Sequence, residues 1–332
     1  MSTALLNFNE SAGQTKVQQL VYSITEAISA GKLKTGDALP SINQLSNETG
    51  FSRDTIFKAY NILKRRNVVE SAPTKGYYVA SETYRIFMLL DDFSNFKEQL
   101  YQSFRQNLPP NYSVDLLFHH YNKEVFNQLI QNSLGRYNTY IVMNISNKNM
   151  APILKKIDSN KLLILDMGNP EGGQYNYVVQ DFNQALRECL KEGLQQLKRY
   201  NELILVYSEE NTPHPDEIVQ AVSDFGDNNS IKTSVVDRLQ ESEVTPGKVF
   251  FVIRDADLVD VIKHCHTKKI EVGKQIGVLS YNDAPMKEIV EGGISVVSTD
   301  FAKMGLLAAQ FAKNKQRVNI VLPTFLTLRN SL

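Results

Sequence analysis

The sequence is short of cysteine, of long apolar runs and of export signals. Its only cysteines are Cys189 and Cys265, too few for a disulfide framework, so a reducing compartment is expected. No apolar run approaches the roughly 20 residues that a membrane-spanning helix needs. The first residues lack the basic start and apolar core of a secretory signal. These absences predict a cytoplasmic protein with no membrane partner.

Enzyme signatures are missing as well. The sequence has no G-x-G-x-x-G, no G-x-x-x-x-G-K-[ST] and no G-x-S-x-G. The run "GNPEGG" at 168–173 lacks the spacing and the lysine of a phosphate loop, and we interpret it as an ordinary surface loop. The run "HCH" at 264–266 does not suit a metal, because residues two apart on a helix do not face together. We therefore expect no catalysis, no metal and no cofactor.

Net charge is zero overall but not locally. The chain has 36 basic and 36 acidic residues, yet residues 1–80 hold nine of the former and six of the latter, a net charge of +3. The remaining residues carry a net charge of −3. A length of 332 residues suggests two or three domains. The small N-terminal part is therefore the candidate for a phosphate-bearing partner.

The first eighty residues show the pattern of a winged helix-turn-helix. Ser41 and Ser52 are positioned to cap a second and a third helix, and Gly50 marks the turn between them. Two β-rich runs follow, "VVE" and "GYYVAS", joined by a turn with Lys75 at its tip. The expected buried stripes are Leu20, Ile24, Ala27 and Ile28 on the first helix, Ile42 and Leu45 on the second, and Ile56, Ala59, Tyr60 and Leu63 on the third.

In such a unit the N-terminal turn of the third helix leads into the major groove of DNA. Arg53 can donate two hydrogen bonds to a guanine edge or to a phosphate, and Asp54 can accept from a cytosine amine or simply favour the positive helix end. Arg65 and Arg66 have two interpretations, a solvated helix end or a phosphate contact. The predicted DNA-binding residues are Ser41, Asn43, Gln44, Ser52, Arg53, Asp54, Thr55, Lys58, Lys75 and Gly76.

These residues resemble a known family. The run "LPSINQLSNETGFSRDTIFKAYNIL", followed by "TKGYYV", is similar to the winged helix-turn-helix of GntR-type bacterial regulators, over about residues 14–80. The resemblance implies that this part binds DNA. One position departs from the family pattern, because Asn43 stands where an arginine usually contacts phosphate. We therefore expect one phosphate contact fewer and a shallower dependence of DNA affinity on salt.

The residues from Tyr84 onward alternate between apolar runs and amphipathic segments. Continuous strands such as "RIFMLL", "LLILDM" and "VFFVIRD" alternate with expected helices at 96–107, 123–133, 182–198 and 215–225. This alternation indicates parallel sheets covered on both faces. Because ligands of such sheets bind beyond the carboxyl ends of the strands, the polar residues that follow each run are the candidates for a site.

Five further runs resemble the effector domain of LacI-type regulators, which is itself similar to periplasmic sugar-binding proteins. They are "VVQDFNQALRECLKEGLQQLKRYNELILVYS", "FFVIRDADLVDVI", "GKQIGVLSYNDAP", "VSTDFAKMGLLAAQ" and "LPTFLTLRNSL". The resemblance implies two lobes with a small ligand in the cleft between them. It suggests the effector-binding residues Asp91, Phe93, Phe96, Asp181, His214, Arg254, Asn282 and Phe301.

Several of these residues also have a purely structural interpretation. Asp181 precedes a helix and can serve as its N-cap, Asn282 can belong to an ordinary turn, and Phe301 can be a core residue. Arg254 is proposed to supply a charge that relatives place in the loop at 208–217, with Glu210, Thr212 and His214 as lesser candidates. Carboxylates, an amide, a guanidinium and aromatic faces together suit a polyhydroxylated ring.

The predicted fold class is an α+β winged helix-turn-helix domain followed by a two-lobed α/β domain. The expected boundaries are 1–80 for the DNA-binding domain, 81–84 for a linker and 85–332 for the effector domain. Lobe 1 takes about 85–180 and 300–322, and lobe 2 takes about 181–298 and 323–332. This composite resembles arabinose- and fucose-responsive bacterial regulators.

The expected function is that of a homodimeric repressor on a pseudo-palindromic operator, released by a monosaccharide such as L-arabinose or L-fucose. A purine or another metabolite as effector, and activation in place of repression, remain open. A transport binding protein is disfavoured by the DNA-binding head and the missing export signal. An aminotransferase-like enzyme would need a longer chain and a cofactor lysine.

Overall fold

The computed structural model describes residues 15–65, 68–73, 75–80, 84–109, 112–145, 151–168, 175–208 and 215–332. Two compact units separate in it, one formed by 1–85 with 109–113 and the other by 86–108 with 114–332. Within the described ranges no helix is long and apolar enough to span a bilayer.

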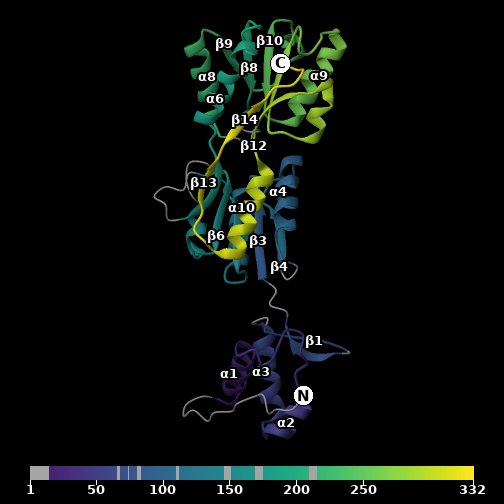
Figure 1. Ribbon diagram of the computed structural model, residues 1–332, viewed down its shortest axis with the longest axis vertical. Helices are drawn as coiled ribbons and strands as arrows, with labels where there is room; N and C mark the ends of the chain where they lie inside the picture. The colour runs from purple at the N-terminus through teal and green to yellow at the C-terminus, as the bar shows by residue number, and fades with distance from the viewer. Residues whose placement is uncertain are drawn as a thin grey trace. The chain divides into compact units, whose positions relative to one another are not determined.

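The N-terminal unit begins with three helices, α1 (Lys16–Ser29), α2 (Ile42–Thr49) and α3 (Arg53–Arg65) (Figure 1). Thr15 caps α1 through a reciprocal pair of bonds with Gln18, and the Ser41 hydroxyl accepts from the amide of Gln44 to cap α2. Gly50 ends α2 in the left-handed conformation, with φ 68°, which glycine adopts without steric cost. The predicted helix boundaries and caps at Ser41 and Gly50 are confirmed.

The wing is a hairpin of β1 (Val69–Ala72) and β2 (Gly76–Val79), paired antiparallel with Val69 opposite Val79. The chain before α2 extends it, because the amide of Leu39 donates to Tyr77 O and that of Val79 donates to Asp37 O. The Tyr60 hydroxyl of α3 donates to Pro40 O over 2.7 Å in the buried interior. One apolar core therefore holds helices and wing together, and it contains the predicted Leu20, Ile24, Ala27, Leu45, Ile56, Ala59, Tyr60 and Leu63. Ile28 and Ile42 are only partly buried at its edge.

The second unit contains two six-stranded sheets. The first has the strand order β13-β7-β6-β5-β3-β4, and its pairs from β13 through β3 are parallel. Its elements are β3 (Tyr84–Leu90), α4 (Asn95–Gln106), β4 (Tyr112–Phe118), α5 (Lys123–Ser133), β5 (Thr139–Met143), η2 (Pro152–Lys156), β6 (Leu162–Asp166), β7 (Asn176–Gln180) and β13 (Asn319–Leu322).

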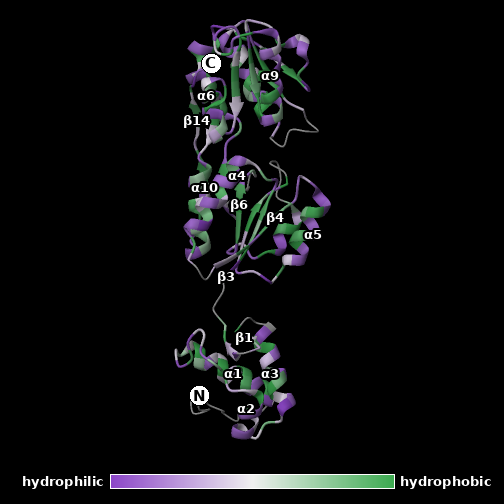
Figure 2. Ribbon diagram, turned by 90° about the vertical axis from the view of Figure 1, so that its right-hand side faces the viewer, coloured by the Kyte–Doolittle hydropathy of each residue, from purple (hydrophilic) through white to green (hydrophobic). Residues whose placement is uncertain are grey.

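The second sheet has the order β14-β12-β11-β10-β8-β9 and is parallel except at β14, which runs antiparallel to β12. Its elements are α6 (Gln184–Glu192), α7 (Leu194–Leu197), β8 (Glu202–Val206), α8 (Glu217–Asn229), β9 (Lys232–Val236), η4 (Glu241–Glu243), β10 (Lys248–Val252), α9 (Asp255–Lys268), β11 (Gly277–Tyr281), η5 (Pro285–Glu288), η6 (Val290–Gly292), β12 (Ser295–Thr299) and β14 (Thr324–Thr327). Helix α10 (Phe301–Asn314) follows β12 but packs against α4, β6 and β7 of the first sheet. Figure 2 shows hydrophobic residues concentrated on the strands of both sheets.

The chain passes between the two sheets three times, from β7 to α6, from β12 to α10 and from β13 to β14. Helix α10 lies against α4 (Figure 1), where Gly305 permits close approach: a Cβ there would stand 2.2 Å from Leu100 O. The expected helix at 182–198 begins only at Gln184 and is interrupted at Gly193, a residue with low helix propensity. The predicted fold class, a winged helix-turn-helix followed by two parallel α/β lobes, is confirmed.

Candidate DNA-binding and effector sites

The N-terminal turn of α3 is exposed and locally ordered. Ser52 caps it, since its hydroxyl accepts from the Thr55 amide at 3.2 Å and lies 2.8 Å from the Thr55 hydroxyl. Asp54 forms an exposed ion pair with Lys58, one turn later, at 2.7 Å. Such a pair contributes little to stability and is easily exchanged for other partners. Arg53 is exposed at the first position of the helix.

The other predicted DNA-binding residues lie on two further elements. Ser41, Asn43 and Gln44 occupy the exposed start of α2, where Gln44 Nε2 donates to Glu48 Oε1. Lys75 and Gly76 lie in the wing, and Lys75 Nζ stands 4.2 Å from the centroid of the Tyr78 ring. Gly76 has φ 72°, which a side chain would make costly. Arg66 lies outside the described residues.

An exposed aromatic on α3 was missed by the sequence reasoning. Phe57 is 48 % exposed, four residues after Arg53, so the two side chains share a face of the helix. In the sequence, Phe57 looks like one more apolar residue next to Ile56. However, Phe57 does not fall on the predicted buried face of the helix, and this position could have indicated that its ring is exposed.

The effector candidate is a cavity of about 320 Å³ lined from both sheets. From the first sheet and its helices come residues that follow β3 and β6, together with the start of α4. From the second come residues that follow β10 and β11, with Phe182 ahead of α6. The described lining residues are Asp91, Asp92, Ser94, Phe96, Lys97, Tyr121, Asp166, Met167, Phe182, Ile253, Arg254, Asp255, Tyr281 and Asn282. The cavity thus lies at the carboxyl ends of the strands, as expected for parallel sheets.

A buried ion pair joins β3 to α4. Lys97 is 3 % exposed and its ammonium contacts the carboxylates of both Asp91 and Asp92. Asp91 also accepts from the Tyr121 hydroxyl at 2.8 Å and from the Asp92 amide. Burial by itself would raise the pKa of Asp91, but the Lys97 charge and these hydrogen bonds hold it below its ordinary value. Asp91 is therefore a fixed anion at the cavity.

Asp166 ends β6 beside this pair and behaves differently. It is 5 % exposed, has φ 63°, and accepts a hydrogen bond from Gln180 Nε2. Burial first, and then the negative charge of Asp91, raise its pKa from 3.8 to about 6, although Lys97 acts in the opposite direction. A carboxyl with a raised pKa inside a cavity is a candidate for ligand binding.

Arg254 reaches the cavity from the end of β10 and is anchored on α9. Its Nε and Nη2 bind the two carboxylate oxygens of Asp257 at 2.8 and 2.6 Å. This two-bonded pairing fixes the plane of the guanidinium. The partner that an arginine at the end of an apolar strand requires is therefore Asp257, and Arg254 lines the cavity from this fixed position.

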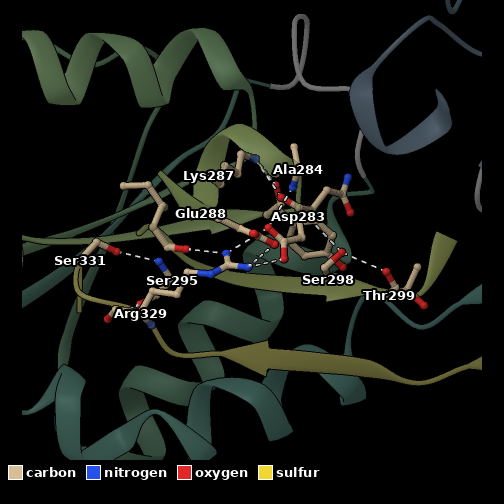
Figure 3. A network of polar contacts seen from close by, with 12 residues as sticks. Asp283, Ala284, Lys287, Glu288, Ser295, Ser298, Thr299, Arg329 and Ser331 are labelled. Carbon is tan, nitrogen blue, oxygen red and sulfur yellow. Dashed lines mark hydrogen bonds and ion pairs between the residues drawn. The ribbon is translucent and has the colours of Figure 1, made fainter. Parts of the chain in front are cut away.

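A network of hydrogen bonds and ion pairs stabilises the turn after β11 (Figure 3). Arg329 binds both carboxylate oxygens of Asp283, at 3.0 and 2.7 Å. The buried Lys287 donates to Tyr281 O and Asn282 O and pairs with Asp255 at 2.9 Å. Asn282, 2 % exposed and with φ 58°, is thereby fixed at the cavity wall. Asn282 therefore belongs to an ordinary turn, as one interpretation predicted, and it also lines the cavity, as the other predicted.

The structure brings four of the predicted effector residues to the cavity: Asp91, Phe96, Arg254 and Asn282. Phe93 is 69 % exposed and packs edge-on against Phe118. Phe301 is buried against Phe96, 4.6 Å between centroids, and does not line the cavity. Asp181 lies outside the lining. It precedes Asn183, the N-cap of α6, by two residues, and its carboxylate accepts from the amides of Asn183, Gln184 and Ala185. His214, with Glu210 and Thr212, lies outside the described residues, as does most of the glycine run at 168–173.

Sequence reasoning missed Lys97, Tyr121, Asp166 and Phe182 as site residues. Two signals were available. Lys97 stands at i−3 from Leu100 on the apolar face of its helix, where a charge needs a partner, and Asp166 ends an apolar strand.

In the run "HCH", Cys265 is buried while His266 lies on the surface 2.6 Å from Glu291. Among the described residues no group of three or more His, Cys, Asp or Glu is arranged to hold a metal.

Two parts of the chain match known protein families. Residues 16–79 match the family of bacterial regulatory proteins, gntR family, and residues 184–332 match the periplasmic binding protein-like domain. The chain thus has an N-terminal part similar to the GntR-type regulators and a C-terminal part similar to the periplasmic-binding-protein-like domain. The first of these matches is to a family of regulatory proteins.

Individual relatives are similar to one part each. The mannosyl-D-glycerate transport/metabolism system repressor MngR of Escherichia coli (strain K12) is 39 % identical over 85 residues, 25 % of this chain and 34 % of that protein. The chain thus spans about a third of that relative. The trehalose repressor from Escherichia coli superposes with a TM-score of 0.61 at 13 % identity, over 74 % of this chain and 100 % of the other. A LacI family regulator from Lactobacillus casei with bound glucose gives 0.60 at 16 %, over 75 % and 100 %.

Proposed function

We propose that this chain is a sequence-specific transcription regulator whose DNA affinity is controlled by a small polyhydroxylated ligand. The observation that carries the proposal is the cavity lined from both sheets by carboxylates, a guanidinium, an amide and aromatic rings. It accompanies a GntR-type helix-turn-helix domain, whose recognition turn is exposed. A regulator of this kind acts in the cytoplasm, where its operator is.

The proposed DNA contacts centre on the first turn of α3. Arg53 reads a guanine or clamps a phosphate, Asp54 and Lys58 exchange their ion pair for DNA groups, and Phe57 meets a thymine methyl. Ser52 and Thr55, already bonded to each other, position this turn and offer hydroxyls to phosphates. Ser41, Asn43 and Gln44 on α2 contact the backbone, and the wing adds Lys75 and Gly76.

The proposed ligand is the size of one monosaccharide. A cavity of about 320 Å³ is at the lower end of the range for small-molecule sites. Phe96, Tyr121, Phe182 and Tyr281 offer faces for C–H groups, while Asp91, Arg254 and Asn282 offer planar partners for vicinal hydroxyls. A pentose or 6-deoxyhexose such as L-arabinose or L-fucose is of suitable size. The relative from Lactobacillus casei was solved with glucose bound.

The proposed mechanism is release of DNA on ligand binding. Because the cavity has walls from both sheets, a ligand that binds both walls stabilises one arrangement of the sheets over others. In a homodimer on a pseudo-palindromic operator, that arrangement sets the spacing of the two α3 helices. MngR is named a repressor, which supports repression relieved by ligand over activation.

A thermal-shift screen of the full chain against a panel of monosaccharides tests the ligand class. A ligand at one hundred times its dissociation constant adds about 2.7 kcal/mol to the free energy of unfolding, which shifts the melting temperature by several degrees. A panel that includes pentoses, hexoses, 6-deoxyhexoses and amino sugars, with no shift for any member, would sink the sugar proposal. Purine bases on the same plate test the alternative effector class.

A further inference from the structure

The cavity holds more carboxylates than cations. Among its described lining residues, four are aspartates and two are basic: Asp91, Asp92, Asp166 and Asp255 against Lys97 and Arg254. A neutral sugar needs hydrogen-bond acceptors but no excess of negative charge. The pairing of these groups decides whether the excess is balanced within the protein.

Two of the charged lining residues are balanced by neighbours. Arg254 is neutralised by Asp257 through two bonds of 2.8 and 2.6 Å. Asp255 is paired with Lys287 at 2.9 Å. Neither residue leaves a net charge for a ligand to match. The excess therefore concentrates on the opposite wall, which belongs to the first sheet.

On that wall three carboxylates share one cation. The ammonium of Lys97 contacts Asp91 and Asp92, both of which follow β3. Asp166 has no ion pair among the described residues; its one hydrogen bond there comes from Gln180. The wall as described thus carries a net charge of −2, with Asp166 at 5 % and Asp91 at 2 % exposure. Buried charge without a partner is costly, so this arrangement suits a ligand that supplies the missing cation.

The surroundings of Asp166 also suit a cation. The cavity includes the rings of Tyr121, Phe182 and Tyr281, and the last two stack at 6.3 Å between centroids. Aromatic faces attract ammonium groups. Burial raises the pKa of Asp166 and the charge of Asp91 raises it further.

We propose that the ligand bears an ammonium group on its polyhydroxylated frame, as an amino sugar does, and that this group binds Asp166 beside the Asp91–Lys97 pair. The inference rests on the proposed function and narrows its ligand class. A charge-assisted bond to Asp166 contributes more than the neutral bond of a hydroxyl. An anionic ligand such as a sugar phosphate or a uronic acid would be repelled by the same wall.

Matched pairs of sugars test the inference with the full chain. The probes are D-glucosamine with D-glucose, D-galactosamine with D-galactose, and D-mannosamine with D-mannose, each measured by isothermal titration calorimetry at pH 7.5. The uncharged N-acetyl derivatives control for the size of the substituent. Asp166→Asn keeps the shape and the acceptor for Gln180 but removes the charge. Asp227→Asn, at an exposed position on α8 outside the lining, is the matched control.

We expect at least one amino sugar to bind about tenfold or more tightly than its neutral partner. Asp166→Asn should reduce that ratio toward one, Asp227→Asn should leave it unchanged, and the ratio should shrink at pH 5, where Asp166 is protonated. Neutral partners that bind as tightly as the amines, or an amine preference that survives Asp166→Asn, overturn the inference and leave the proposed function standing. Absence of binding by both classes overturns this inference and the sugar proposal together.

Discussion

Arg329 grips Asp283 with two parallel hydrogen bonds and so ties the segment after β14 to the turn that carries Asn282. The same guanidinium donates to Ile294 O, which keeps it in place. We expect Arg329→Ala to lower the free energy of unfolding by about 1–3 kcal/mol and to weaken ligand binding. Urea unfolding and calorimetry measure the two effects. Arg329→Lys keeps the positive charge but cannot form two parallel hydrogen bonds, so its stability and ligand affinity should be intermediate. Arg238→Ala, at an exposed position, is the control. An Arg329→Ala protein with unchanged ligand affinity would show that this turn is not part of the site.

Arg254 should separate ligand response from DNA binding. Arg254→Ala removes the guanidinium from the cavity and leaves Asp257 unpaired, so ligand binding should be lost while operator affinity is kept. Asp257→Asn retains the guanidinium but loosens its position, and it should weaken the ligand by a smaller factor. Fluorescence anisotropy of labelled operator, with and without ligand, measures both properties. A normal ligand response in Arg254→Ala would reject the assignment.

The charge of Asp166 should make stability depend on pH. A raised pKa means that the folded state binds this proton more tightly than the unfolded state. The associated stability is fully present below pH 3.8 and is lost as the pH rises through about 6. Burial is the main cause of this shift; Asp91 and Asp92 add to it, whereas Lys97 and the hydrogen bond from Gln180 oppose it. The hydroxyls of Tyr121 and Tyr281 also face Asp166, whose charge adds to the effect of burial in raising their own pKa values.

Asp166→Asn should therefore stabilise the ligand-free protein at pH 8 by about 2–3 kcal/mol and have little effect near pH 4. Unfolding curves of both proteins at several pH values give the difference directly. Subtracting the free energy of unfolding of the wild-type protein from that of Asp166→Asn at each pH removes the contributions of the other carboxyls. A difference that is constant with pH would mean that Asp166 has an ordinary pKa in the folded protein.

Arg53 and Lys75 should affect DNA binding in different ways. Arg53→Ala should cost about 1–3 kcal/mol of operator affinity and relax specificity at one base position, whereas Lys75→Ala should weaken all sequences alike and lower the salt slope by about one. Titrations of operator and scrambled DNA at several salt concentrations distinguish the two. Exposed Lys313→Ala, on α10, is the control. Equal losses on both DNAs for Arg53→Ala would make it a phosphate contact.

The fold was largely predictable because its signals are local. Ser41 and Gly50 bound α2 through their own backbone chemistry, and apolar runs such as "LLILDM" predict buried parallel strands. Two features depart from the prediction: Gly193 interrupts the expected long helix, and β14 pairs antiparallel with β12 in an otherwise parallel sheet.

The site was predictable only in part. Asp91, Arg254 and Asn282 follow strands, and they were predicted because ligands bind beyond the carboxyl ends of parallel strands. This rule cannot tell a ligand contact from a helix cap, and Asp181 faces its own helix amides. Tyr121 reaches Asp91 across 30 positions of sequence, a contact that no local pattern contains. The excess negative charge appears only once such pairings are known.

The most direct test of the account follows operator release by a ligand. An operator is first selected from a random DNA pool with the purified full chain, and its complex is then titrated with the matched sugars while anisotropy is recorded. We expect an amino sugar to release the operator from the wild-type protein, more effectively than its neutral partner, and to fail to release it from Arg254→Ala. Operator binding that no member of the sugar panel changes, or release that is the same in Arg254→Ala, would contradict this expectation.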